Sequence, residues 1–285
     1  MRRGVDSAAA RESRTHEART REVAWKHARE YNRLIVDVSS RLKWYWRLQK
    51  LFAPKLQAPQ YAYFAALARF LDRAPVWLDL GCGRAIVPDW FAPAEFVRYQ
   101  KAVDRAKMLV GFDYDEESLR DSALVRKVRG DVGALPFATG TFDLVSANMV
   151  VEHLQRPESS LREIARILKS SGILVFHTVN LRSPFIAMQA LAPDWLKRPL
   201  IRLIDLREEE DVFKTYYRLN TSSSIAKCAE SAGFRVVEIK TVCSPPITWV
   251  LGPLVVVEFL IIRLLGWEAL GVLRPNLIVV LERAS

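Results

Sequence analysis

The order of apolar and amphipathic segments constrains the fold of this chain more than any other feature. From Pro75 onward, short runs rich in Val, Leu, Ile and Phe alternate with segments of helical periodicity. These runs predict five strands, at Val76–Leu80, Met108–Phe112, Val125–Arg129, Phe142–Ala147 and Gly172–Thr178. Alternating strands and helices predict a parallel sheet with right-handed crossovers and helices on both faces. We therefore expect a doubly wound α/β fold.

The last third of the chain interrupts this alternation with two insertions, at 181–219 and 245–272. The first carries a basic amphipathic stretch, Trp195–Leu206, and the second begins with an unusually apolar run, Pro245–Leu265. Three further elements are expected between and after them: a helix at Ser222–Ala232 that ends at Gly233, and strands at Phe234–Val242 and Leu277–Glu282.

The N-terminal segment has a composition of its own. Residues 1–50 hold 13 Lys and Arg against 6 Asp and Glu, whereas the remaining 235 residues hold 29 against 26. We expect 1–58 to form a basic, Trp-rich arm, with about the first 20 residues disordered and helical segments across 21–53. A helix at 59–72 then leads into the α/β domain, 59–285. Such an arm suits an anionic surface or forms a solvated helical face.

The cysteines and the N-terminus bear on location. The three cysteines, Cys82, Cys228 and Cys243, show no CxxC spacing, and no His cluster has zinc-ligand spacing, so we expect no structural metal and a reducing compartment. The first 22 residues contain no apolar stretch of the kind that a signal peptide needs. The expected location is the cytoplasm.

A glycine-containing turn follows the first predicted strand. The run Asp79-Leu80-Gly81-Cys82-Gly83 lies between that strand and a helical segment, at the sheet edge where such folds bind ligands. The third glycine of the dinucleotide fingerprint is missing, which disfavours a pyrophosphate ligand. An acid before the glycines suits the amino group of an amino-acid moiety.

Two further acids end the next two predicted strands. Asp113 follows the second strand, where a carboxylate can accept hydrogen bonds from both hydroxyls of a ribose. Asp131 follows the third strand and either accepts a hydrogen bond from an adenine amino group or caps a turn. Asp115 is expected to cap a surface helix.

These segments together resemble one enzyme family. The segments are Val76–Gly83, Gly111–Asp113, Gly130–Phe137, Phe142–Leu154 and Leu161–Val179. They resemble the class I S-adenosylmethionine-dependent methyltransferases, and most of all the type 11 methyltransferase domain family. The two insertions are similar to those of uncharacterised bacterial members. The resemblance implies a Rossmann-like seven-stranded sheet whose last strand is antiparallel.

The resemblance also implies a cofactor, S-adenosyl-L-methionine, and the residues that bind it. Asp79 and the glycines of the first turn match the residues that contact the methionine part. Asp113, at the end of the second strand, matches the ribose-binding acid. Asp131 and Val132, after the third strand, match the residues that contact adenine. The expected cofactor-binding residues are Asp79, Gly81, Cys82, Gly83, Asp113, Tyr114, Asp131, Val132, Asn148 and Met149. Two positions depart from the family pattern: Ala85 replaces a glycine, and Lys169–Gly172 replaces the usual Lys-Pro-Gly-Gly turn.

Methyl transfer is a direct displacement that depends mainly on alignment and water exclusion, so it requires no covalent residue. A general base would help with a hydroxyl acceptor. The candidates are His153 and Tyr217, with His177 as a further one, and each has a packing or stabilising role as its alternative. Some related quinone O-methyltransferases bind a metal near a Glu-His pair, but Met149 stands where their earlier Glu would be. We expect no metal.

The apolar run Pro245–Leu265 is long enough to cross a membrane, but it contains Pro253, Glu258 and Arg263. The predicted strands on either side of it belong to one sheet, so a single crossing would separate them. We therefore expect a helical hairpin that enters or lies on a membrane surface, or a buried lid over the active site. The alternatives are that the apolar and basic segments cover one another or form a dimer interface.

The sequence therefore predicts an S-adenosylmethionine-dependent methyltransferase. Its expected acceptor is a lipophilic or lipid-linked molecule, methylated on O, N or C at a membrane surface by a protein that contacts the inner face of the membrane peripherally. Three alternatives remain: a soluble small-molecule methyltransferase, an RNA methyltransferase and a non-catalytic cofactor-binding protein. Nucleic acid is disfavoured because the basic surplus lies in one arm and no RNA-binding module is recognisable.

Overall fold

The computed structural model describes residues 43–191 (except 84, 89, 90 and 123), 214–246 and 254–284. The chain divides into two compact units, one of Met1–Pro54 with Ile247–Phe259 and one of Lys55–Pro246 with Leu260–Ser285. Four expectations lie wholly or partly outside the described residues: the disordered N-terminus, the helix before residue 43, the basic stretch Trp195–Leu206 and the first part of the apolar run.

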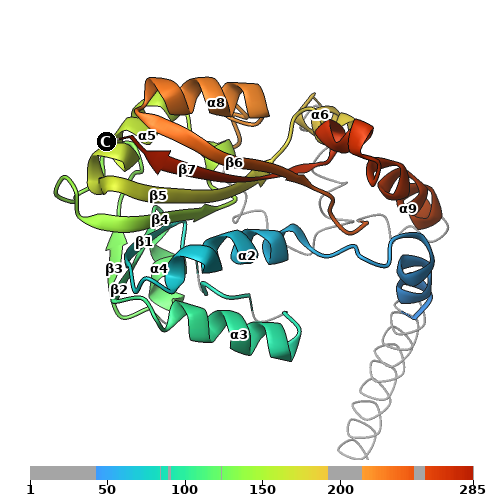
Figure 1. The fold of residues 1–285 in the computed structure, drawn as a ribbon, viewed down its shortest axis with the longest axis horizontal. Coiled ribbons are helices and arrows are strands. Elements are labelled where there is room, and N and C mark those ends of the chain that lie inside the picture. The colour runs from blue at the N-terminus through green and yellow to red at the C-terminus, as the bar shows by residue number, and fades with distance from the viewer. Residues whose placement is uncertain are drawn as a thin grey trace, which may run out of the picture. The chain divides into compact units, whose positions relative to one another are not determined.

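The larger unit is built on one seven-stranded sheet with the order β3-β2-β1-β4-β5-β7-β6 (Figure 1). Its strands are β1 Val76–Leu80, β2 Met108–Asp113, β3 Lys127–Arg129, β4 Phe142–Asn148, β5 Leu168–Val179, β6 Phe234–Val242 and β7 Asn276–Arg283. The pairs from β3 across to β5 are parallel, whereas β7 runs antiparallel to both β5 and β6. The Rossmann-like sheet with an antiparallel last strand is confirmed.

Strands β3 and β5 begin two and four residues away from the predicted positions, and the other strands match the predicted bounds to within one residue. Strand β3 begins at Lys127 and not at Val125, whose side chain is 93% exposed and so contributes nothing to the sheet. Strand β5 begins at Leu168, which pairs with Phe142, although the chain turns at Ser171 with a φ of 59°. The preceding helix therefore ends at Ile167, directly before the strand.

Helices cover both faces of the sheet, α2 and α3 on one and α5 and α8 on the other (Figure 1). The helices are α2 Pro59–Leu71, α3 Pro93–Val103, α4 Glu116–Asp121, α5 Pro157–Ile167, α6 Pro184–Leu191, α8 Ser222–Ser231 and α9 Leu254–Leu265, with 3₁₀ turns η1 Val151–His153 and η4 Glu268–Leu273. Thr221 and Ser224 form a capping box at the start of α8, and Gly233 follows its end with a φ of 82°.

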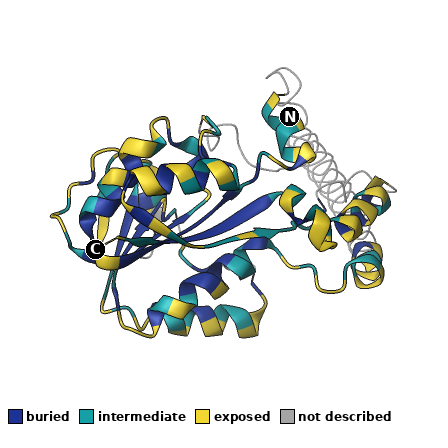
Figure 2. Cartoon of the chain, turned by 45° about the horizontal axis from the view of Figure 1, so that its top comes forward, coloured by how far each residue is buried: buried dark blue, intermediate teal, exposed yellow. Residues whose placement is uncertain are grey.

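The alternation of side chains along the strands produces two apolar clusters, one on each face. In β7, Leu277, Val279 and Leu281 join the cluster under α5 and α8, whereas Ile278 and Val280 join the cluster under α2 and α3. Figure 2 shows the strands as buried between helices whose outer faces are exposed. The core thus fixes the carboxyl ends of β1, β2 and β4 beside one another.

The described part of the smaller unit consists of a helix at 43–52 and the first half of α9. Phe259 is fully buried and contacts Tyr45 and Phe52, with ring centroids 5.5 and 6.4 Å away. Burial, together with the negative charge of Glu258, raises the pKa of Tyr45 to about 12. None of the described helices has the length and apolarity that a membrane crossing requires.

Candidate cofactor and active site

The turn after β1 brings the predicted glycines against the end of β2. The amides of Gly81 and Cys82 both donate to the carbonyl of Phe112, at 2.8 and 3.2 Å. Gly81 and Gly83 have φ values of 64° and 52°, in the left-handed region. A Cβ on Gly81 would lie 2.4 Å from Cγ2 of Val150, whereas a Cβ on Gly83 would meet nothing within 4 Å. The chain therefore needs glycine at the first position and leaves space for a ligand at the second.

This difference predicts unequal effects of alanine at the two glycines. Both substitutions strain a left-handed residue, but only Gly81→Ala also forces a contact with Val150. We expect Gly81→Ala to lower the free energy of unfolding by at least about 1 kcal/mol more than Gly83→Ala. Urea unfolding measures both, and Val150→Ala in the Gly81→Ala background should recover part of the loss. Equal losses at the two glycines would contradict this role of Val150.

Asp113 ends β2 with its carboxylate oriented by two backbone amides. Its Oδ2 accepts from the amide of Gly83 and its Oδ1 from the amide of Asp115, both at 3.0 Å. Each carboxylate oxygen has a second lone pair, so two further donors can bind the same group. The neighbouring Tyr114 side chain is exposed, and Asp115 caps α4 by accepting from the amide of Ser118, as expected.

Asp79 is buried at the end of β1. Its Oδ1 accepts a hydrogen bond from the hydroxyl of Ser146, which itself accepts from Nε1 of Trp77 at 2.7 Å. Burial raises the pKa of Asp79 to about 7; the Ser146 hydrogen bond opposes the rise and the charge of Asp113 adds to it. No Lys or Arg of the described chain forms an ion pair with this carboxylate. A buried acid without a cation favours a positively charged ligand beside it.

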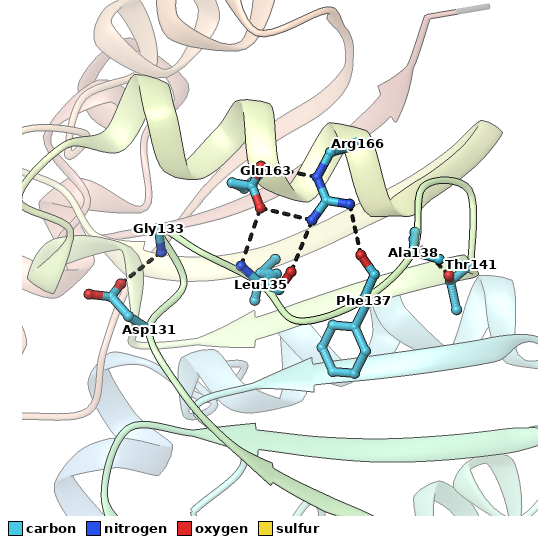
Figure 3. Close-up of polar contacts among 8 residues, drawn as sticks. All are labelled: Asp131, Gly133, Leu135, Phe137, Ala138, Thr141, Glu163 and Arg166. Carbon is cyan, nitrogen blue, oxygen red and sulfur yellow. Dashed lines mark hydrogen bonds and ion pairs between the residues drawn. The ribbon is translucent and has the colours of Figure 1, made fainter.

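Asp131 makes the contact of a turn cap. Its Oδ1 accepts from the amide of Gly133 at 2.7 Å, and the side chain is exposed beyond the end of β3 (Figure 3). The backbone of Gly130, the preceding residue, donates to the carbonyl of Asp113 at 3.1 Å. Asp131 and Val132 thus lie next to the ribose acid, and their contact with adenine stays a prediction.

The end of β4 carries Asn148 and Met149, and both contact His177 of β5. The Asn148 amide oxygen lies 2.8 Å from Nδ1 of His177, and the Met149 amide donates to the His177 carbonyl at 2.9 Å. Met149 has a φ of 58°, which directs a partly exposed side chain away from the strand.

His177 itself is buried and has a stabilising role. Burial lowers its pKa to about 4, although the contact with Asn276 opposes this shift. Its ring nitrogens lie within hydrogen-bond distance of Asn148 and Asn276, at 2.8 and 3.0 Å. A neutral imidazole has one N–H, so one of the two asparagines must present its NH₂ group to the ring. The ring therefore joins β4, β5 and β7.

The two candidate bases meet at Glu152, the acid of the Glu152-His153 pair, to which the sequence alone assigned no role. The Glu152 carbonyl accepts from the amides of Tyr216 and Tyr217, at 2.8 and 3.2 Å. Its buried carboxylate accepts from the hydroxyl of Thr178 at 2.9 Å, and burial raises its pKa. Its sequence signal is the Glu152-His153 pair shortly after the fourth predicted strand.

His153 has a defined tautomer. Its Nδ1 lies 3.0 Å from the carbonyl of Lys214, and a carbonyl can only accept, so Nδ1 carries the proton. In the neutral ring the basic nitrogen is then Nε2. Tyr217 has a φ of 53°, and its amide donates to the carbonyl of Glu152, so its backbone lies beside the residue that precedes His153.

Comparison with known proteins decides the family. Residues 55–239, more than half of the chain, match a family model described as a methyltransferase domain. The chain belongs to this methyltransferase family. The match covers every predicted cofactor residue and ends within β6.

Known relatives and solved structures agree with this assignment. The methyltransferase is 26% identical over 194 residues to a protein of Encephalitozoon cuniculi that is named as a methyltransferase, covering 65% of this chain and 83% of that one. It is 35% identical over 110 residues to a malonyl-[acyl-carrier protein] O-methyltransferase of Legionella pneumophila and 29% identical over 113 residues to a mitochondrial ubiquinone biosynthesis O-methyltransferase of Saccharomyces cerevisiae. These matches cover 36% and 39% of this chain and 36% of each relative.

A solved S-adenosylmethionine-dependent methyltransferase from Mesorhizobium loti has the same fold. The two structures superpose with a TM-score of 0.51 over 79% of this chain and 98% of that one, at 15% identity. The fold is thus that of the class I methyltransferases, and S-adenosylmethionine is the cofactor that the family implies.

The residues of the methyltransferase fit this cofactor. S-adenosylmethionine is a sulfonium cation with an amino acid, a ribose and an adenine. Asp79 supplies a buried acid that pairs with no cation among the described residues. Asp113 supplies two oriented oxygens for a diol, and Gly83 a turn with room beside it. We expect these three residues to hold the methionine and ribose parts.

Proposed function

We propose that this methyltransferase methylates a lipophilic or lipid-linked acceptor at the cytoplasmic surface of a membrane, to which it binds peripherally. The cofactor supplies a methyl group bound to a positively charged sulfur. The protein aligns the acceptor with that methyl and excludes water. For a hydroxyl acceptor, Nε2 of His153 is our first candidate to receive the proton, and the phenolate form of Tyr217 is the second.

The observation that carries this proposal is an exposed apolar face on α9. Leu254, Val257, Ile261 and Leu264 recur at helical spacing, and each is between 47% and 55% exposed. The other side of the helix is already buried through Val255, Phe259 and Ile262. A helix that packs on one side and remains aliphatic on the other favours an apolar surface as its second partner.

The helix at 43–52 supports the same proposal, because its exposed surface combines apolar side chains with positive charges. Trp44, Trp46 and Leu51 are exposed among the likewise exposed Lys43, Arg47 and Lys50. Exposed Trp beside Lys and Arg is typical of helices that lie in the interface of an anionic membrane. Three cysteines without disulfides suit the cytoplasmic side.

Two relatives favour an oxygen acceptor. Both the Legionella pneumophila and the Saccharomyces cerevisiae proteins are named as O-methyltransferases, and the latter belongs to ubiquinone biosynthesis. We therefore place oxygen first among the possible acceptor atoms.

Co-sedimentation with vesicles of phosphatidylcholine and phosphatidylglycerol tests the membrane contact. We expect Val257→Ser/Ile261→Ser/Leu264→Ser to bind at least about 10-fold more weakly than the wild type, because three aliphatic side chains no longer enter the bilayer interface. The matched control is Val97→Ser/Val125→Ser/Val237→Ser, which removes three exposed valines from other surfaces. Wild-type sedimentation by the α9 variant would refute the proposal, as would an equal loss in the control.

A further inference from the structure

The loop between β3 and β4 carries the two predicted adenine contacts, Asp131 and Val132. It has few backbone hydrogen bonds of its own: Ala134 donates to the carbonyl of Asp131 at 3.0 Å and Phe137 to that of Leu135 at 2.8 Å. Its conformation must therefore be set largely by groups outside it.

One ion pair on α5 supplies those groups (Figure 3). The Arg166 guanidinium donates to the carbonyls of Phe137 at 2.7 Å and Leu135 at 2.9 Å. Glu163, one turn earlier, accepts from the amide of Leu135 at 3.2 Å and also pairs with Arg166 at 2.9 and 3.0 Å. Three backbone groups of the loop are thus fixed by two side chains.

The pair is charged and geometrically specific. The Arg166 hydrogen bond outweighs partial burial and lowers the pKa of Glu163, and the same bond raises the pKa of Arg166. A partly exposed ion pair contributes little by itself. The planar guanidinium, however, reaches two carbonyls and a carboxylate at once, which an ammonium cannot do with the same fixed geometry.

The loop is also tied by packing to the strand that ends in the ribose acid. Leu135 is buried, and the Phe137 ring contacts Phe112 and Phe142 with centroids 6.1 and 5.0 Å away. Phe112 immediately precedes Asp113. A displacement of the loop backbone at 135–137 would therefore also shift the residues on the adenine side of the site.

We propose that Arg166 and Glu163 are positioning residues that set cofactor base specificity by fixing the backbone of the loop 130–141. The inference rests on the proposed adenine contact of Asp131 and Val132. Neither side chain touches the cofactor in this account, because both act through the backbone of Leu135 and Phe137.

The test compares S-adenosylhomocysteine with S-inosylhomocysteine, in which an oxygen replaces the adenine amino group, by calorimetry. The wild type should prefer the adenine compound. Arg166→Met removes all the donors, and we expect it to bind S-adenosylhomocysteine about 10-fold more weakly and to lose most of that preference. Arg166→Lys keeps the charge without the planar fork and should fall between the two.

The matched control is Arg162→Met, one turn earlier on α5, where the arginine pairs with Glu158 at 3.4 Å on the helix surface. It should keep wild-type affinity and preference. If Arg166→Met fails to fold, Arg166→Lys carries the test. An unchanged preference in the folded Arg166 variant would overturn the inference. Failure of the wild type to prefer adenine would instead contradict the adenine contact of the loop, and failure to bind either compound would contradict the cofactor site.

Discussion

The Asp113→Ala variant is expected to bind S-adenosylhomocysteine at least about 100-fold more weakly than the wild type. The substitution removes two charge-assisted hydrogen bonds to the ribose, each worth about 1.5–3 kcal/mol. It also frees the amides of Gly83 and Asp115, which orient the turn beside the cofactor. Calorimetric titration measures the loss directly.

Asp115→Ala is the matched control. Asp115 is also an acid just beyond the end of β2, but its carboxylate caps α4 through the amide of Ser118 at 2.7 Å. We expect this variant to lose some stability with the helix cap and to bind the cofactor product within a few-fold of the wild type. An Asp113→Ala variant with near wild-type affinity would show that the ribose lies elsewhere.

The second large effect concerns Asp79 and pH. Its pKa is raised to about 7, so between about pH 4 and 7 the folded protein keeps a proton that the unfolded chain has released. The cofactor-free protein should therefore lose stability as the pH rises through this range, by on the order of 4 kcal/mol for this group. Asp79→Asn removes the titration, so its advantage over the wild type should grow from pH 4 to pH 8. Urea unfolding at a series of pH values measures it.

Asp143→Asn provides a control of opposite sign. Burial acts to raise the pKa of Asp143, but hydrogen bonds from Lys169 and from the amide of Val76 outweigh it and lower that pKa. This carboxylate therefore stabilises the fold when ionised, and its variant should lose stability relative to the wild type as the pH rises. Parallel pH profiles for the wild type and Asp79→Asn would contradict a buried acid without a cation.

The sheet could be predicted from the sequence because its central strands are buried on both faces and read as continuous apolar runs. Strands β1 and β6 have the predicted bounds. The turn after the first strand was predictable too, because the glycines that form it directly follow the apolar strand in the sequence. The role of Asp131 could not be predicted in the same way, because a carboxylate at this position suits both a turn cap and a ligand contact.

Other parts of the site depend on contacts between distant residues. Glu152 meets the amides of Tyr216 and Tyr217 across 64 and 65 positions of the chain, and His177 meets Asn276 across 99. Nothing local to either residue specifies its partner. The steric conflict that Val150 would impose on a side chain at position 81 is likewise invisible in the sequence.

Helix α9 shows a different limit. Its residues are aliphatic on nearly every side, so periodicity could not tell which face packs inward. The structure assigns Val255, Phe259 and Ile262 to the buried face and leaves Val257, Ile261 and Leu264 exposed. That assignment is what turns an apolar run into a defined surface whose partner can be tested.

The most direct test of the account is methyl transfer itself. The protein is incubated with S-adenosylmethionine carrying a tritiated methyl group and with vesicles of a bacterial total lipid extract, and the product is partitioned between water and organic solvent. We predict organic-soluble label with the wild type and none with Asp113→Ala. Label that enters only water-soluble acceptors or RNA supplied in the same reaction would contradict a lipophilic acceptor at a membrane surface.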